Sequence, residues 1–193
     1  MALDTNEVRL APNGSVWVGP VGVTEPTNTS TAWATVDSDW MDFGYINEDG
    51  VSVTPSVDTN SIRAWQSLHD LKRPIVGVEF EVSFVPMQVN QTTVGVYFLG
   101  SEDDFENVGG ATGRLEIPNS PGTQERALGI EWTDDEGDVN RLVVPRAQIT
   151  DREALQLQRP EALTFGVTFV ALAGPAGYMG VFLSDNLDLI PAT

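Results

Sequence analysis

Apolar and polar residues alternate along much of this chain, and alternation with a period of two predicts β-strands. The clearest run covers residues 75–86, where the two sets are Val76, Val78, Phe80, Val82 and Phe84 against Gly77, Glu79, Glu81 and Ser83. Residues 162–173 alternate in the same way, with Leu163, Phe165, Val167 and Phe169 against Thr164, Gly166 and Thr168. Each strand should therefore bury one face and keep the other hydrated.

Shorter patterned segments predict further strands and two hairpins. Apolar residues on either side of a Glu-Asp-Gly turn predict a hairpin in residues 43–53, because Gly50 can adopt the positive φ that such a turn demands. A second hairpin is predicted for residues 126–133 and 139–145, with a core face made of Leu128, Ile130 and Trp132. Single strands are expected at residues 14–19 and 178–183.

The segments between these strands are predicted to be irregular. Turn-forming residues are frequent in residues 20–35, a proline interrupts residues 54–60, and residues 100–113 are acidic and rich in glycine. Residues 61–71 are expected to be extended or mixed in structure, and a short helix is expected near residues 151–156. The long connection at residues 20–35 could reach a neighbouring subunit as an arm.

Together these elements predict one domain over residues 1–193, in which residues 1–40 supply a first strand and an arm or loop region. The expected architecture is mainly β, a β-sandwich or partly rolled barrel with one flanking α-helix. No apolar run approaches the ~20 residues that span a bilayer, and the N-terminus lacks the regions of a signal peptide. We therefore expect a soluble protein, made in the cytoplasm and without a membrane partner.

Composition excludes several kinds of chemistry. The chain has no cysteine and a single histidine, His69, so it offers no thiolate and little from which to build a zinc site or a Ser-His-Asp triad. The net charge of −18 repels phosphate and excludes a basic nucleic-acid-binding stripe. From charge alone, acidity that keeps the protein soluble is favoured over an acidic wall that lets DNA pass without holding it.

Signatures of enzymes and metal sites are missing from the sequence. It has no dinucleotide-binding glycine loop, Walker phosphate loop, His-Glu-x-x-His or nucleophile elbow. Glu79 and Glu81 would lie about 7 Å apart on one strand face, but with 28 acidic residues such a pair indicates nothing without a cleft. The acidic turn at residues 134–138 lacks the ligand spacing of a calcium loop. We expect no enzymatic activity, no cofactor and no metal.

The five tryptophans divide into two groups. Trp17, Trp65 and Trp132 lie in patterned segments and are expected in the core. Trp33 and Trp40 lie in or beside the irregular region, so we expect them to be apolar anchors of a subunit interface, exposed in a monomer.

An ordered set of segments resembles the major tail tube proteins of long-tailed, non-contractile bacteriophages. It begins with Phe43-Gly44-Tyr45-Ile46-Asn47-Glu48-Asp49-Gly50-Val51, Pro55-Ser56 and Ile62-Arg63-Ala64-Trp65. It continues with the long strand from Ile75 and with Val143-Val144-Pro145-Arg146-Ala147-Gln148-Ile149-Thr150, so that the likeness covers residues 40 to 183. Because that family has a helix after its long strand, we predict a helix for residues 92–99, which have high β-propensity but could be capped by Asn90.

The resemblance implies hexameric rings that stack into the tube through which viral DNA leaves, with the inner sheets joined in one ring-wide β-barrel. It implies a bore lined by polar strand faces, for which the candidates are Glu79, Glu81, Ser83, Thr164, Thr168 and Glu131. Contacts within and between rings would come from loops at residues 20–40, 54–74 and 100–124, and the interface candidates are Trp33, Trp40, Asp103 and Asp104.

The same resemblance implies partners and a location. The partners are other copies of the chain, a tape measure protein, tail terminator and tail tip proteins, and double-stranded DNA that passes without specific binding. The location is the virion tail, after assembly in the cytoplasm of the host bacterium. Two alternatives stay open: a carbohydrate-binding or adhesion β-sandwich module, and the tube protein of a related secretion or contractile system.

Overall fold

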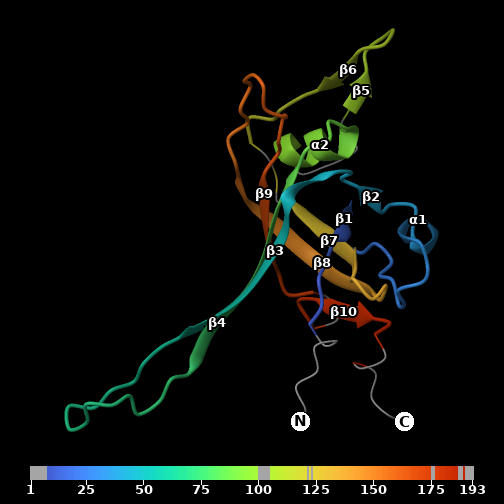
Figure 1. Cartoon of the computed structure of the whole chain (residues 1–193). Helices are drawn as coiled ribbons and strands as arrows, with labels where there is room; N and C mark the ends of the chain where they lie inside the picture. The colour runs from blue at the N-terminus through green and yellow to red at the C-terminus, as the bar shows by residue number, and fades with distance from the viewer. Residues whose placement is uncertain are drawn as a thin grey trace.

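The computed structural model describes residues 8–99, 105–120, 122, 124–174, 177–186 and 189. The strands are β1 (Asn13–Gly19), β2 (Met41–Asp42), β3 (Ile46–Thr59), β4 (Ile75–Pro86), β5 (Phe105–Asn107), β6 (Gly113–Leu115), β7 (Glu125–Thr133), β8 (Val139–Arg152), β9 (Val167–Ala171) and β10 (Val181–Ser184). The helices are α1 (Trp33–Val36) and α2 (Gln91–Leu99). Together they form a β-rich body from which one long two-stranded arm projects (Figure 1).

One antiparallel sheet makes up most of the body. Its strand order within the described residues is β2-β1-β7-β8-β9-β4-β3, and β10 pairs with β8. The small sheet of β5 and β6 lies beyond α2, at the end of the molecule away from the arm (Figure 1). The mainly β prediction is therefore confirmed, and the large sheet is open, because β2 and β3 remain at its two edges.

The main core gathers the apolar face of the large sheet and part of α2. Its fully buried side chains include Val16, Val18, Val82, Leu128, Phe169 and Val96. The Phe84 ring stacks on Phe169 with centroids 5.9 Å apart and meets Phe43 edge-on at 5.0 Å. The predicted core positions Leu128 and Ile130 are confirmed, while Trp132 packs partly buried against the same core.

Helix α2 forms despite its β-propensity because its first turn is held by Asn90. The Asn90 Oδ1 atom accepts a hydrogen bond from the Thr93 backbone N–H at 2.7 Å, the contact of an N-cap. The Asn90 Nδ2 group donates to the Phe43 carbonyl at 3.1 Å, which ties the start of the helix to the body. The predicted helix is confirmed, and tertiary contacts decide its structure against local propensity.

The hairpin predicted for residues 43–53 is wrong. Residues 46–59 form the single strand β3, which pairs along its length with β4. Gly50 does have a positive φ of 70°, but it lies at a register shift between the pairs Ile46–Pro86 and Val51–Phe84. The glycine therefore marks a bulge and not a turn.

Three other local predictions differ from the structure. Of the predicted loop at residues 54–60, residues 54–59 are strand, which the proline permits because β3 is an edge strand. The short helix expected near residues 151–156 is absent, since β8 continues to Arg152 and residues 153–158 have no regular structure. The last long strand is confined to β9, shorter than the predicted residues 162–173.

Residues 20–40, here called the strap, cover the second side of the sheet over β7 and β8. Trp33 and Trp40 are buried in a small second core with Val23, Ala127 and Val143, and their rings meet at 4.8 Å. The prediction that a monomer leaves these two indoles exposed is wrong, because the strap folds back on its own subunit. Only 2% of the Trp33 surface and 3% of the Trp40 surface remain accessible.

A buried arginine fastens the strap to the sheet. The Arg141 guanidinium donates to Glu131 Oε2 at 2.6 Å and to the Asn28 carbonyl at 2.8 Å, and it lies 5.0 Å from the centroid of the Trp33 ring. The Trp33 indole N–H donates to the same Glu131 oxygen at 3.0 Å. Because the buried cation is paired and hydrogen-bonded, its desolvation is compensated within the subunit.

Candidate functional site: a polar sheet face and a projecting arm

The side of the sheet opposite the main core is mainly polar across β3, β4, β9 and the end of β8, with Val170 among its apolar exceptions. One row of cross-strand neighbours runs from Ser52 through Ser83 and Thr168 to Asp151. None of these four side chains is fully buried. The structure thus brings two of the predicted bore residues, Ser83 and Thr168, directly opposite each other.

The two glutamates predicted to line a bore lie on the same side of the sheet. Glu81 stands between Thr54 and Val170 in the strand register, and Glu79 stands opposite Ser56. No basic residue faces either glutamate across the register. This part of the face therefore carries negative charge beside uncharged neighbours.

One arginine at the end of this face is neutralised by a carboxylate. Arg146 binds Glu125 in a two-pronged contact, with its Nε and Nη2 atoms 2.7 Å and 2.9 Å from the carboxylate oxygens. Hydrogen bonding from Arg146 holds the pKa of Glu125 below its usual range, so the carboxylate stays charged at neutral pH. The pair adds no net positive charge to the polar face.

The remaining predicted site residues lie elsewhere. Thr164 is half-buried in the irregular segment before β9. Glu131 lies under the strap, bound by Arg141 and Trp33. Asp103 and Asp104 fall outside the described residues.

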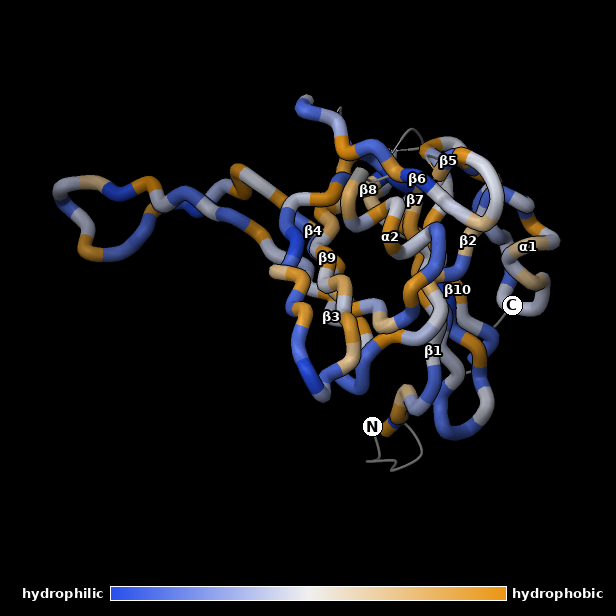
Figure 2. Tube along the Cα trace, turned by 90° about the horizontal axis from the view of Figure 1, so that it is seen from above, coloured by the Kyte–Doolittle hydropathy of each residue, from blue (hydrophilic) through white to orange (hydrophobic). Residues whose placement is uncertain are grey.

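Beyond the body, β3 and β4 continue as the stem of the arm (Figures 1 and 2). On one side of this ribbon, Val57 faces Val78, and the two side chains are 54% and 58% exposed. On the other side, Ser56 faces Glu79. The stem thus repeats the two-sided character of the sheet, but no described residue covers its apolar side.

Residues 60–74, here called the arm tip, close the ribbon with little regular structure. One backbone bridge joins Ile62 and Lys72, and Asp70 binds Arg63 at 2.7 Å and lies 3.6 Å from Arg73. The hydrogen bond from Arg63 holds the pKa of Asp70 below its usual range. Trp65 is 99% exposed and Leu68 is 100% exposed, so the core position predicted for Trp65 is wrong.

The chain was compared with known proteins. A family model described as phage tail tube protein matches residues 1–193. The chain belongs to the phage tail tube protein family. A tail tube protein is a structural component of a phage or phage-like particle and not an enzyme. The sequence-based expectations of a structural role and of no enzymatic activity are therefore confirmed.

Among solved structures, this tail tube protein is similar to a chain of the PVC sheath–tube complex of an extracellular contractile injection system in its extended state. That match has a TM-score of 0.49 and 11% identity, and it covers 95% of this chain and 99% of the other. A second match, from the six-fold symmetrised baseplate of the anti-feeding prophage, has a TM-score of 0.46, 10% identity and coverages of 97% and 100%. A search of curated proteins gave no match.

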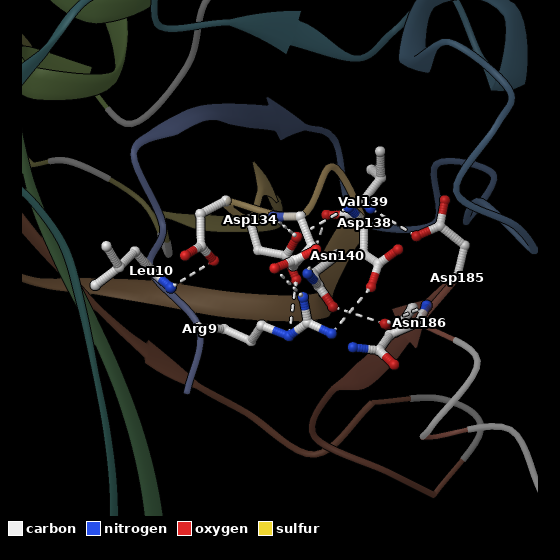
Figure 3. Close-up of polar contacts among 11 residues, drawn as sticks. Arg9, Leu10, Asp134, Asp138, Val139, Asn140, Asp185 and Asn186 are labelled. Atoms are coloured by element: carbon white, nitrogen blue, oxygen red, sulfur yellow. Dashed lines mark hydrogen bonds and ion pairs between the residues drawn. The ribbon is translucent and has the colours of Figure 1, made fainter. Parts of the chain in front are cut away.

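The acidic turn between β7 and β8 of the tail tube protein serves the subunit itself (Figure 3). The Asp134 Oδ1 atom accepts hydrogen bonds from the backbone N–H groups of Glu136 and Asp138. The Arg9 guanidinium lies within 4.0 Å of Asp134, Glu136 and Asp138, and the Leu10 N–H donates to Asp135. These contacts hold the described start of the chain against the turn.

Metal-binding clusters and membrane-spanning helices are both absent from the described residues. No group of three or more His, Cys, Asp or Glu residues placed to hold a metal ion occurs among them. Neither helix in the described part of the chain has the length and apolar character to span a bilayer.

Proposed function

We propose that copies of this chain form hexameric rings that stack into a tail tube, with the polar face of β3, β4, β9 and β8 turned to the bore. The observation that carries the proposal is the strand face that holds Glu79, Glu81, Ser83 and Thr168 on neighbouring strands, with Val170 as an apolar neighbour of Glu81. DNA binds proteins chiefly through cations that neutralise its phosphates. On this face the described cation is Arg146, which is bound to Glu125. Such a wall does not retain the DNA duplex as it passes.

The arm stem and the open sheet support assembly with neighbouring copies. A two-stranded ribbon with one solvent-exposed apolar side is marginally stable in water. An unpaired edge strand exposes a row of backbone hydrogen-bond donors and acceptors. The stem of β3 and β4 has this bare side, and β3 forms one edge of the sheet. Burial of both features against adjacent subunits completes a wall and joins the inner sheets into one ring-wide barrel.

The same proposal covers the kind of tail and the proteins that join the tube. The long, non-contractile kind of tail follows from the sequence resemblance, as do the tape measure, terminator and tail tip partners. Assembly takes place in the host bacterial cytoplasm before the tube becomes part of the virion. Electron microscopy of the purified protein tests the core of the proposal, since it predicts six-fold rings stacked around an open channel.

Reversing the charge of the polar face should slow the passage of DNA. We expect the double variant Glu79→Lys and Glu81→Lys to form tubes of normal width, because these exposed or half-exposed side chains lie outside the core. Ejection from virions carrying it should be slower and depend strongly on salt, since two added cations per subunit attract phosphate. The measurement is the ejection rate from receptor-triggered particles at several salt concentrations.

The matched control carries the same change of charge away from the sheet face. Asp39 and Glu161 are exposed and lie outside the large sheet, so Asp39→Lys with Glu161→Lys alters net charge equally. Equal ejection rates for the two double variants would contradict the assignment of the bore.

A further inference from the structure

Charge is unevenly divided between the arm tip and the rest of the subunit. The tip holds Arg63, Lys72 and Arg73 against the single acid Asp70, which gives it a charge of +2. The whole chain carries −18, so the remainder carries −20. The tip is therefore attracted to the body of any other copy that it can reach.

The tip also presents apolar surface that water disfavours. Trp65 and Leu68 are fully exposed, and Leu71 is 58% exposed. Tryptophan and arginine are both enriched among the residues that contribute most to binding at protein interfaces. The surface that receives this tip should be apolar inside, anionic and free of lysine and arginine.

A groove between α2 and the β5–β6 sheet has these properties. It measures about 470 Å³, and Val89, Val94, Phe105 and Ala111 supply apolar lining. Glu106 lies in the same lining, which contains no lysine or arginine. Arg114 stands opposite Glu106 in the β5–β6 register, but its guanidinium is bound to Glu116.

The tip and this groove lie at opposite ends of the molecule (Figure 1). A single subunit cannot bring them together by its own fold. A contact between two different patches is heterologous, and when its repetition does not close into a ring it builds a filament. The arm tip and the groove are therefore positioned to form such a repeating contact between successive copies.

We propose that the arm tip of one copy docks in the groove between α2 and β5–β6 of a second copy, with Trp65 entering the groove and Lys72 facing Glu106. This rests on the proposed function, because it names the acceptor surface through which copies join along a tube. Indole burial supplies the apolar contact, and the basic tip supplies salt-dependent attraction.

Cross-linking tests the contact directly. The chain has no cysteine, so Gln66→Cys provides one attachment point for a benzophenone maleimide beside the intact Trp65. Assembled protein made from isotopically light and heavy chains is irradiated, digested and analysed by mass spectrometry. We expect light–heavy cross-links to peptides containing residues 89–94 or 105–113. Cross-links confined to other surfaces, or to single chains, would overturn the proposal.

Charge exchange tests the same contact without a label. We expect Lys72→Glu to raise the concentration needed for polymerisation at least tenfold, and Glu106→Lys to restore it when both changes are combined. Arg159→Glu is the matched control, since this exposed residue lies outside the arm and should leave polymerisation unchanged. Failure of the rescue, or an equal effect of the control, would overturn the assignment.

Stacked rings of wild-type protein with cross-links elsewhere would leave the tube standing and remove this acceptor. Wild-type protein that stays monomeric in the electron microscope would remove the proposed function itself.

Discussion

Replacing Trp33 with alanine is expected to lower the free energy of unfolding by about 3–5 kcal/mol, the usual cost of truncating a large buried aromatic side chain. The indole fills the second core, packs against Trp17 and Trp40, and donates to Glu131. Without it the strap loses its anchor and the Arg141 guanidinium loses the ring beside it. Urea unfolding followed by circular dichroism measures the effect, at a protein concentration below that needed for polymerisation and in salt that screens the attraction of the arm tip.

Gly129 provides an independent test of the same packing. A methyl group at this position would overlap the Trp33 ring, so Gly129→Ala alone should destabilise the fold by roughly 1–3 kcal/mol. In the Trp33→Ala background the clash is gone, and the added methyl group should cost much less. Trp65→Ala serves as the control, because its fully exposed indole contributes little to folding. Additive effects at positions 33 and 129, or a stable Trp33→Ala variant, would contradict this account.

Removing the arm tip should abolish polymerisation while leaving the subunit folded. Thr59 and Ile75 are partners in the β3–β4 register, so replacing residues 60–74 with Asn-Gly closes the ribbon by a tight turn. The body keeps both of its cores, because no residue of the tip belongs to either. Sedimentation velocity should show only monomers at concentrations where the wild-type chain forms tubes, and far-UV circular dichroism should show the same folded signal.

A variant of full length separates the length of the arm from its chemistry. Trp65→Ser, Leu68→Ser and Leu71→Ser keep the reach of the arm and remove its apolar side chains. We expect this triple variant to polymerise as poorly as the truncated chain. Tubes formed by the truncated chain would show that the arm is dispensable for assembly.

The local sequence pattern was sufficient to predict strands that alternate strictly or that pair with a neighbour close in sequence. Residues 75–86 form β4 with the predicted bounds, and the β7–β8 hairpin joins segments separated by five residues. The pattern failed at residues 46–59, because a Glu-Asp-Gly sequence fits a turn and a bulge equally well. Only pairing with β4, which lies beyond the arm tip, decides between them.

In the candidate site, too, local pattern predicts some features and long-range pairing decides the others. That Glu79, Glu81 and Ser83 share one side follows from the period of a strand alone. That Thr168 stands opposite Ser83 depends on pairing across more than eighty residues, which no local pattern contains. The burial of Trp33 beside Glu131 could not be predicted, because Arg141, which contacts both residues, comes from another strand. Trp65 was predicted in the core but is exposed, because the spacing of apolar residues does not distinguish a buried core from a solvent-exposed apolar surface.

The arm has no hinge at its root, since β3 and β4 pass from body to arm as continuous strands. Its direction is therefore fixed by the twist of the sheet that also carries the polar face. Copies linked through such arms are held at a set angle to one another. A tube built in this way bends only by small elastic changes shared among many joints, so that its channel stays open along a curved path.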